Sequence, residues 1–397
     1  QPLDGGDHGG GEYARADFGR LLKRDIDRQL GCLVDAKREL PADVEAAVRD
    51  RGLTVRLFES KAALQALLQS SSARRFFSAL PYHYGELDFR NLEVVFTVHG
   101  LRPVEMPTDR LEVLYADRVS QVATWIAKQL FTQAYRKWHL AKVQRLVAVE
   151  AQRTTVVVPS EHTKNALLEL TSLTPRTEVQ VLYSPVTGVA ESEEIDRSIL
   201  AEFGLRQGRF LLIVSGNRWI KNAWRALDAM AGLAEELSPP SDFDIAVTGG
   251  LPHRIRKHSG GRLKVLPYVN RSQLRALYTD AYSLVYPSLN EGFGYPPLEA
   301  MACGTPVLSS NVCSLPEILG DAALYFDPHR RDQMADCIRQ IISDRNLWEH
   351  YRSLGAARYQ TVRSRQELDL ERLCDLIVGN SPTNSRSVTL SDTPGHG

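Results

Sequence analysis

Short apolar runs alternate with longer amphipathic stretches along most of the chain, and this alternation limits the possible folds more than any other feature. It is typical of a parallel sheet wrapped by helices, because parallel strands need a long crossover connection. Helices are predicted at 13–22, 41–51, 160–170 and 348–378. The predicted strands are 31–34, 53–58, 92–98, 146–148, 155–158 and 179–182 in the first half, and 210–215, 243–248, 263–266, 283–286 and 306–309 in the second.

A polar, acidic segment at 184–197, with Pro185 and Gly188, interrupts the pattern and is predicted to be a linker. We therefore predict an α/β protein of two doubly wound, Rossmann-like domains, residues 1–185 and 186–352, facing each other across a cleft. Ligands of such sheets bind at the carboxyl ends of the strands, so the cleft is the expected site. Residues 380–397 are rich in Ser, Thr, Pro and Gly, and we expect a disordered tail there.

Charge and cysteine content exclude several classes of function. The 48 basic residues balance 48 acidic ones, so no basic field for nucleic acid is expected. The five cysteines are far apart and form no CxxC pair, which argues against a disulfide framework or a zinc site and favours a reducing compartment. The sequence has no apolar run of about 18 residues to span a bilayer, and we expect a cytoplasmic protein.

The segment at 286–309 carries the strongest chemical signal. Gly292 and Gly294 follow a predicted strand and allow the backbone to approach a ligand closely. Two consecutive prolines then begin a helix, whose free N–H groups and positive dipole end attract an anion. Glu291 in the loop and Glu299 in the helix suit ligand hydroxyls. The alternative is two solvated surface carboxylates, which the neighbouring glycines and prolines disfavour.

A second segment, 210–229, runs from a buried strand through a Ser-Gly-Asn-Arg turn into a helix. Arg218 and Lys221 follow this strand and would lie at the same sheet edge as Glu291. Two cations in a cleft can neutralise a diphosphate, arginine by bidentate contact and lysine as a point charge. An ordinary basic surface turn is the alternative, and the neighbouring glutamate segment favours the functional interpretation.

These segments resemble the family-4 retaining glycosyltransferases of the GT-B fold (glycosyl transferases group 1). EGFGYPPLEAMACGTPVLSS is similar to the family's donor motif, with Glu291 and Glu299 as its Glu-x7-Glu pair. GNRWIKN at 216–222 is similar to its Gly…Lys-Asn loop, and TVHG at 97–100 to its Thr-x-His-Asp stretch. The similarity is highly specific over 286–328, moderate over 210–230 and weak before residue 90.

The resemblance implies a GT-B protein in which residues 1–185 bind the acceptor and residues 186–352 bind the donor. Residues 353–379 would form a helix that packs back on the first domain. The implied reaction moves a hexose, mannose-type or glucose-type, from a nucleotide-diphosphate sugar to a glycan or lipid-linked acceptor, with retention of configuration. Polysaccharide or lipopolysaccharide biosynthesis is the implied setting. No cofactor and no metal are implied, and the nucleotide sugar is a substrate.

Each site residue takes its role from the family motif that it matches. Glu299 would bind the donor ribose and Glu291 the sugar hydroxyls. Lys221 and Arg218 would bind the diphosphate, where cations stabilise the negative charge that develops on the leaving group. The other implied site residues are His99 beside the sugar's reactive face, the backbone of Gly292, Phe293 and Gly294 against the sugar, Gly216 and Asn222 in the Gly…Lys-Asn loop at the donor, Tyr268 and Val269 at the base, and Gly9, Gly10 and Gly11 at the donor phosphate or the acceptor.

Two departures from the family pattern leave alternatives open. Arg218 precedes the lysine by only three residues, so Arg225 is a second candidate for the phosphate arginine. Gly100 stands where an aspartate is common.

A nucleotide-sugar epimerase or a non-catalytic sugar-nucleotide-binding protein of the same fold would share these motifs. A glycoside hydrolase could use the two glutamates as acid and base, but it would leave the glycines, prolines and cations unexplained.

Other polar residues give weaker signals. The two Asp-x-Asp matches, 25–27 and 242–244, fit metal sites poorly and are expected to be solvated. His162, like the histidines at 139 and 253, has no partner at a diagnostic spacing and is expected to be structural or exposed.

The stretch Val122 to Arg145 combines aromatic and basic residues and is a candidate for peripheral contact at the inner face of a membrane. The simpler alternative is a helix that packs one face on the core.

Overall fold

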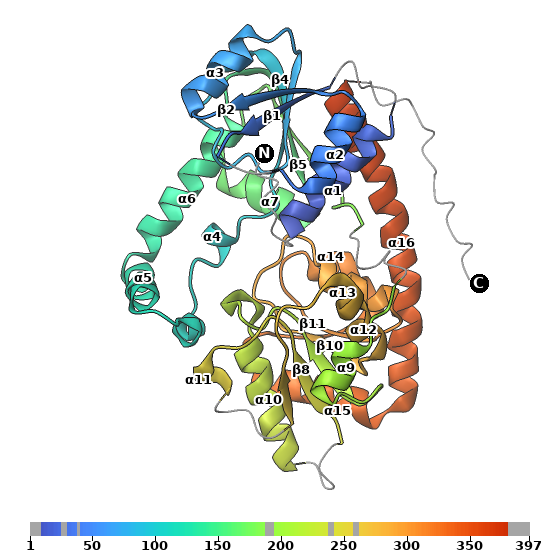
Figure 1. Ribbon diagram of the computed structural model, residues 1–397. Helices are drawn as coiled ribbons and strands as arrows, with labels where there is room; N and C mark the ends of the chain where they lie inside the picture. The colour runs from blue at the N-terminus through green and yellow to red at the C-terminus, as the bar shows by residue number, and fades with distance from the viewer. Residues whose placement is uncertain are drawn as a thin grey trace, which may run out of the picture.

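The computed structural model describes residues 9–24, 30–37, 40–186, 194–236, 242–256 and 262–379. It contains two α/β lobes, with helices around parallel sheets in each (Figure 1). The predicted tail and the Asp-x-Asp pair at 25–27 lie outside the described residues. None of the described helices has both the length and the apolar character that crossing a bilayer would require.

The N-terminal lobe is built on two parallel sheets. One pairs β1 (Gly31–Asp35) with β2 (Thr54–Phe58). The other has the order β3-β4-β5-β6, so its strands follow one another across the sheet as they do along the chain. Its strands are β3 (Arg75–Ser78), β4 (Phe89–Thr97), β5 (Ala151–Val158) and β6 (Thr177–Val181).

The C-terminal lobe has one parallel sheet of order β12-β11-β10-β7-β8-β9. After β7 the chain adds β8 and then β9 on one side of β7. It then crosses back and adds β10, β11 and β12 in turn on the other side. The strand order therefore reverses between β7 and β10, and the loops after these two strands open the crevice where such sheets bind ligands. The strands are β7 (Phe210–Ile213), β8 (Asp244–Val247), β9 (Leu263–Val265), β10 (Ser283–Tyr286), β11 (Val307–Ser310) and β12 (Ala323–Phe326).

The central strands β7 and β10 are buried throughout because helices cover both faces of the sheet. Successive side chains of a strand point to opposite faces. Accordingly, Phe210 and Leu212 belong to one buried cluster, whereas Leu211 and Ile213 belong to another. The covering helices and 3₁₀ turns of the C-terminal lobe are α9 (Ser198–Phe203), η3 (Trp219–Lys221), α10 (Ala223–Glu236), α11 (His253–Arg256), α12 (Arg271–Asp280), α13 (Tyr295–Ala302), α14 (Leu315–Leu319), η4 (Gly320–Ala322) and α15 (Arg331–Ser343).

Side-chain caps begin several helices of the N-terminal lobe. Ser60 and Ser160 accept hydrogen bonds from the backbone N–H groups three residues later, at the starts of α3 and α7, which satisfies donors that a helix end leaves without partners. The elements of this lobe are α1 (Gly9–Leu22), α2 (Ala42–Asp50), α3 (Lys61–Ser70), α4 (Arg102–Glu105), η2 (Arg110–Tyr115), α5 (Val119–Leu130), α6 (Thr132–Val147) and α7 (Glu161–Leu170).

Helix α16 (Arg345–Val378) runs along one side of both lobes (Figure 1). Tyr359 packs into the core of the C-terminal lobe, and Leu373 packs beside Tyr13 in a core cluster of the N-terminal lobe. Arg24 of the N-terminal lobe pairs with Asp375 at 2.8 Å. The helix thus crosses between the lobes, and it begins at Arg345, close to the start of the helix predicted at 348–378.

Most predicted strands lie within a few residues of an observed one, and the exceptions are short. The strand predicted at 146–148 is wrong, because Leu146 and Val147 form the buried end of α6. Two observed strands, β3 and β12, were not among those predicted. Each has four residues, so neither is long enough to show a clear period in the sequence.

Candidate active site

A cleft of about 1530 Å³ lies between the two lobes, at the edge where β7 and β10 end. Both lobes contribute to its walls, as expected when two doubly wound sheets face each other. The topology brings together residues that are almost 200 positions apart in the sequence. The predicted site residues that line the cleft are His99, Arg218, Lys221, Tyr268, Val269, Glu299 and residues 291–294.

The loop after β10 is shaped by two glycines whose positions have no room for a side chain. Gly294 has φ 118°, a conformation that L-residues rarely adopt, and it caps the start of α13. A Cβ on Gly292 would lie 1.8 Å from the carbonyl oxygen of His99 in the other lobe. The Ser160 hydroxyl donates to the Gly292 carbonyl at 2.9 Å. The loop at 290–294, called the donor loop below, is therefore one point where the lobes touch.

Gly100, the departure from the family's aspartate, has a structural reason. Its φ is 149°, which lies in the region that favours glycine. A Cβ there would be in ordinary van der Waals contact with the Cα of Gly292, 3.6 Å away, so the backbone conformation rather than lack of space favours glycine. The residue lets the backbone after β4 pass close to the donor loop.

Lys221 and Glu291 form a buried ion pair at the carboxyl ends of β7 and β10. Lys221 Nζ lies 2.5 Å from Glu291 Oε1, and the two side chains are 9% and 15% exposed. The same carboxylate oxygen accepts hydrogen bonds from the hydroxyls of Tyr286 at 2.8 Å and Ser288 at 2.5 Å. Lys221 Nζ also donates to the Tyr286 hydroxyl at 2.6 Å. This network fixes both charged groups in the wall of the cleft.

The surroundings shift the pKa of both members of the pair. Burial would raise the pKa of Glu291, but the charge and hydrogen bond of Lys221 outweigh it, so the pKa lies below its ordinary value. Burial lowers the pKa of Lys221, and the adjacent carboxylate of Glu291 opposes that shift. The carboxylate is thus held ionised beside a cation that has lost most of its water.

Glu299 is also buried, which excludes the solvated helix residue considered as the alternative. It is 6% exposed in α13, and the Tyr278 hydroxyl donates to its Oε2 at 3.0 Å. Burial raises the pKa of Tyr278 well above its ordinary value, so this hydroxyl remains a hydrogen-bond donor. The contact orients a carboxylate that also lines the cleft.

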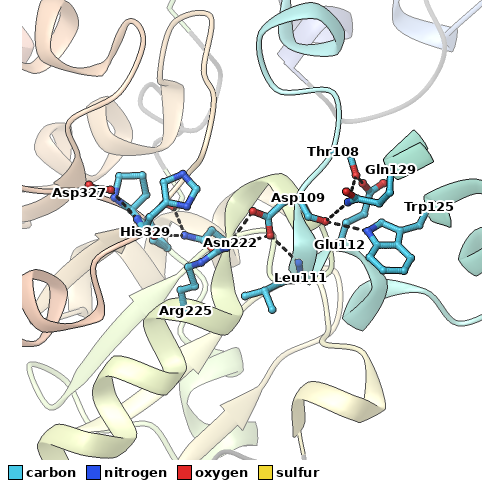
Figure 2. Close-up of polar contacts among 12 residues, drawn as sticks. Thr108, Asp109, Leu111, Glu112, Trp125, Gln129, Asn222, Arg225, Asp327 and His329 are labelled. Atoms are coloured by element: carbon cyan, nitrogen blue, oxygen red, sulfur yellow. Dashed lines mark hydrogen bonds and ion pairs between the residues drawn. The ribbon is translucent and has the colours of Figure 1, made fainter. Parts of the chain in front are cut away.

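Of the two candidate phosphate arginines, the structure places only Arg218 at the cleft. Arg225 instead reaches Asp109, with Nη2 3.1 Å and 3.0 Å from the two carboxylate oxygens, as Figure 2 shows. Both side chains of this pair are nearly buried. The alternative assignment of Arg225 is therefore wrong, because this guanidinium is engaged in a contact between the lobes.

Asn222 and Gly216 lie next to the cleft but are not among the residues that line it. The Asn222 amide donates to the carbonyls of Pro287 at 3.0 Å and Pro328 at 2.9 Å, and its oxygen accepts from Arg225 (Figure 2). A Cβ on Gly216 would lie 2.2 Å from a methyl group of Val247. Asn222 thus joins the loops after β7 and β10, and Gly216 allows the first of these loops to pack on β8. The donor contact expected of both residues stays a prediction.

His99 follows β4 and lines the cleft. Its Nε2 lies 2.8 Å from the Ala79 carbonyl, and its ring packs edge-on against Tyr13 at 4.6 Å. Burial lowers the pKa of His99 to about 4, although the hydrogen bond to Ala79 opposes this shift. The imidazole is neutral at pH 7, so it can contribute a hydrogen bond or a dipole but no positive charge.

The remaining predicted residues lie at the edges of the site. Tyr268 is 67% exposed at the cleft, and Val269 beside it is buried. Gly9, Gly10 and Gly11 form the first turn of α1 rather than a separate loop. Glu12, which follows them, lines the cleft and pairs with Arg271 of the other lobe at 3.0 Å.

Sequence reasoning missed the groups that hold the charged residues in place. Tyr286 and Ser288 lie within the recognised motif, so their proximity to Glu291 was a usable signal. No such signal points to Tyr278 or Asp109, because each contacts its partner, Glu299 or Arg225, from a different element of the chain.

The comparisons with known proteins agree with this geometry. Residues 197–361 match the protein family described as Glycosyl transferases group 1. O-antigen chain mannosyltransferase B of Escherichia coli is 46% identical over 98 residues, 25% of this chain and 25% of that protein. O-antigen chain mannosyltransferase RfbU of Salmonella typhimurium is 42% identical over 80 residues, 20% of this chain and 23% of that protein. The chain thus matches about a quarter of the length of these relatives.

Solved structures match over almost the whole chain. WaaG, a glycosyltransferase involved in lipopolysaccharide biosynthesis, has a TM-score of 0.61 and 17% identity, covering 93% of this chain and 96% of WaaG. Anabaena Alr3699/HepE in complex with UDP-glucose has a TM-score of 0.63 and 15% identity, covering 93% and 96%. The predicted fold is confirmed: the chain has the GT-B fold, with two Rossmann-like lobes facing across a cleft.

Proposed function

We propose, from the premise that residues 197–361 belong to the glycosyl transferases group 1, that this chain transfers a hexose from a nucleotide-diphosphate sugar to a glycan or lipid-linked acceptor. The observation that carries the proposal is the buried Lys221–Glu291 pair beside Arg218, at the crevice where the strand order reverses. A diphosphate is the ligand that two cations at such a crevice suit best.

The charge arrangement supports a direct account of bond cleavage. When the bond between sugar and diphosphate breaks, negative charge grows on the leaving phosphate and positive charge on the sugar ring. In this proposal Lys221 and Arg218 stabilise the first charge, and the Glu291 carboxylate, which the adjacent Lys221 keeps ionised, stabilises the second. Preorganised groups of this kind need no reorganisation during the reaction. We propose that the transfer proceeds with retention and without a metal at the diphosphate.

The division of labour between the lobes is part of the proposal. Residues 1–185 would bind the acceptor and residues 186–352 the donor, with Glu299 on the ribose and Tyr268 and Val269 at the base. Mannose is the sugar favoured, because the two relatives cited above are O-antigen mannosyltransferases by name. Polysaccharide or lipopolysaccharide assembly at the cytoplasmic face of a membrane is the corresponding setting.

One assay separates the candidate functions. The protein is incubated with a panel of UDP- and GDP-sugars, and release of the nucleotide diphosphate is measured with and without glycan acceptors. We expect slow release with one donor alone and faster release when an acceptor is added. Epimerisation of the donor without diphosphate release would indicate the epimerase, and donor binding without turnover would indicate the non-catalytic protein; either result would overturn the proposal.

Replacing Glu299 tests the donor assignment. Glu299→Gln retains the size of the side chain but removes the charge that accepts ribose hydroxyl hydrogen bonds. Since a hydrogen bond to a charged group contributes about 1.5–3 kcal/mol, we expect the donor Kd to rise by roughly 10- to 150-fold. Isothermal titration calorimetry measures it, with Glu202→Gln, an exposed residue of α9 in the same lobe, as the control. An unchanged Kd for the Glu299 variant would remove this residue from the site.

We also propose that the α5–α6 hairpin contacts the membrane. Helix α5 has no buried residue, whereas α6 packs Val143 near its end into a core cluster of the N-terminal lobe. Figure 1 shows the hairpin projecting from the side of the molecule. Leu130 and Phe131 at its turn are 72% and 65% exposed. Exposed apolar groups beside basic residues are typical of segments that lie at a bilayer surface.

Liposome sedimentation tests this contact. We expect the protein to sediment with anionic vesicles at low salt and less at high salt, because charge attraction is screened. Leu130→Ser combined with Phe131→Ser should reduce binding severalfold. Leu368→Ser, which removes an apolar side chain 60% exposed on α16, is the matched control and should bind as the unmodified protein does. Equal binding of all three proteins would disprove a role for the hairpin.

A further inference from the structure

Three side chains with metal-ligating atoms meet outside the donor site, where the lobes touch. Glu105 ends α4 and His162 lies in the first turn of α7, both in the N-terminal lobe. Cys313 lies just before α14 in the C-terminal lobe. One carboxylate oxygen, one imidazole nitrogen and the cysteine sulfur all lie within 4.8 Å of one another. No spacing in the sequence indicates this cluster, because its members come from three distant segments.

Polar contacts hold these side chains in a defined arrangement. His162 Nε2 lies 2.7 Å from Glu105 Oε1. The Asn290 amide donates to Glu105 Oε2 and to Cys313 Sγ, each at 3.1 Å. The backbone N–H of His162 donates to Glu317 Oε2 at 3.2 Å, which fixes the start of α7 against α14. His162 is therefore a partnered side chain, which agrees with the structural role that was one of the two expected for it.

The backbone at Cys313 is strained. Its φ is 52°, a left-handed conformation that costs a residue other than glycine about 1–3 kcal/mol and that clusters at functional sites. The next residue secures this turn, since the Ser314 hydroxyl donates to the carbonyls of Glu291 at 2.9 Å and Phe293 at 3.0 Å. The thiol is thereby placed at the lobe boundary by contacts to the donor loop itself.

We propose that Glu105, His162 and Cys313 bind one divalent transition-metal ion of the zinc class, which links the two lobes. Thiolate, imidazole and carboxylate are the ligands that zinc uses, and three protein ligands leave a fourth tetrahedral position for water. A harder cation such as Mg²⁺ would not favour the sulfur. Binding requires the thiolate of Cys313, the carboxylate of Glu105 and a neutral imidazole of His162, so the thiol proton is released to solvent and two anionic ligands balance the charge of the ion.

The ion would act on the donor loop through its neighbours. Asn290 contacts two of the three ligands and precedes Glu291, and Ser314 follows the third ligand. Metal binding should therefore hold the lobes together and restrain the loop, without contacting the diphosphate. This site is separate from the proposed chemistry at Lys221 and Arg218.

Co²⁺ serves as the probe because it binds at zinc sites and, unlike Zn²⁺, forms complexes that absorb visible light. Titration of the full chain with Co²⁺ alone should produce a thiolate-to-cobalt charge-transfer band that saturates at one ion per chain, and Zn²⁺ should displace it. Cys313→Ser should lose the band. Cys32→Ser, which replaces another half-buried free cysteine, should retain it. Glu105→Gln should weaken Co²⁺ binding at least about tenfold, since the loss of even an outer-shell partner costs about that much.

Thermal unfolding gives a second, independent measurement. Zn²⁺ should raise the Tm of the unmodified protein and of Cys32→Ser but leave the Tm of Cys313→Ser unchanged, because an ion that binds only the folded state stabilises it. Absence of the charge-transfer band at saturating Co²⁺, or its persistence in Cys313→Ser, would overturn the proposal. Neither measurement involves sugar transfer, so failure here and failure of the proposed function are distinguishable.

Discussion

Lys221→Ala should reduce the turnover of sugar transfer by roughly 100- to 1000-fold, the loss typical when one preorganised group that stabilises developing charge is removed. Two effects combine at this position. The diphosphate loses a cation, and Glu291 loses the partner that lies 2.5 Å away in a buried site. Leaving one buried charge unpaired costs about 3–5 kcal/mol of stability. Initial rates of nucleotide diphosphate release at saturating donor measure the first effect, and denaturant unfolding measures the second.

A double variant separates the two effects. Lys221→Ala combined with Glu291→Gln removes both charges, so it should recover much of the lost stability while remaining inactive. Lys264→Ala, on β9 of the same lobe, is the control for removing a lysine and should keep full turnover. Normal turnover in a folded Lys221→Ala protein would refute the assignment of Lys221 to the diphosphate.

Gly292→Ala should have a comparable effect through geometry alone. Its Cβ would lie 1.8 Å from the His99 carbonyl oxygen, a backbone atom that cannot rotate away, so the donor loop and the other lobe must separate. A displacement of 1 Å at a reacting centre costs on the order of 100-fold in rate. We therefore expect turnover to fall by about that factor while the fold is retained. Circular dichroism and initial rates together measure the outcome.

The matched control is Gly19→Ala in α1. A Cβ at Gly19 meets no atom within 4 Å, and alanine favours a helix interior more than glycine does. This variant should therefore keep its activity and be at least as stable as the unmodified protein. If Gly292→Ala also kept full turnover, the close approach of the lobes at the donor loop would not be needed for transfer.

The fold and the C-terminal half of the site could be predicted because their signals are local. The apolar strand 210–213 and the glycines at 292 and 294 carry their consequences within one strand–loop–helix unit. The parallel sheet then brings the two loops together, since both follow strands at the point where the strand order reverses.

The contacts between the lobes could not be predicted in this way. The choice between Arg218 and Arg225 was decided by Asp109, which arrives from η2 of the other lobe. The approach of Cys313 to His162 and Glu105 likewise depends on how the two lobes meet. No period or spacing in the chain encodes that relation, because such side chains share no element.

The structure of the protein with its preferred nucleotide-diphosphate sugar bound tests the central claim most directly. We predict phosphate oxygens within hydrogen-bond distance of Lys221 and Arg218, the ribose hydroxyls on Glu299 and the sugar against the donor loop. A nucleotide sugar bound outside the cleft between the lobes, or bound there with its diphosphate away from both cations, would contradict the account.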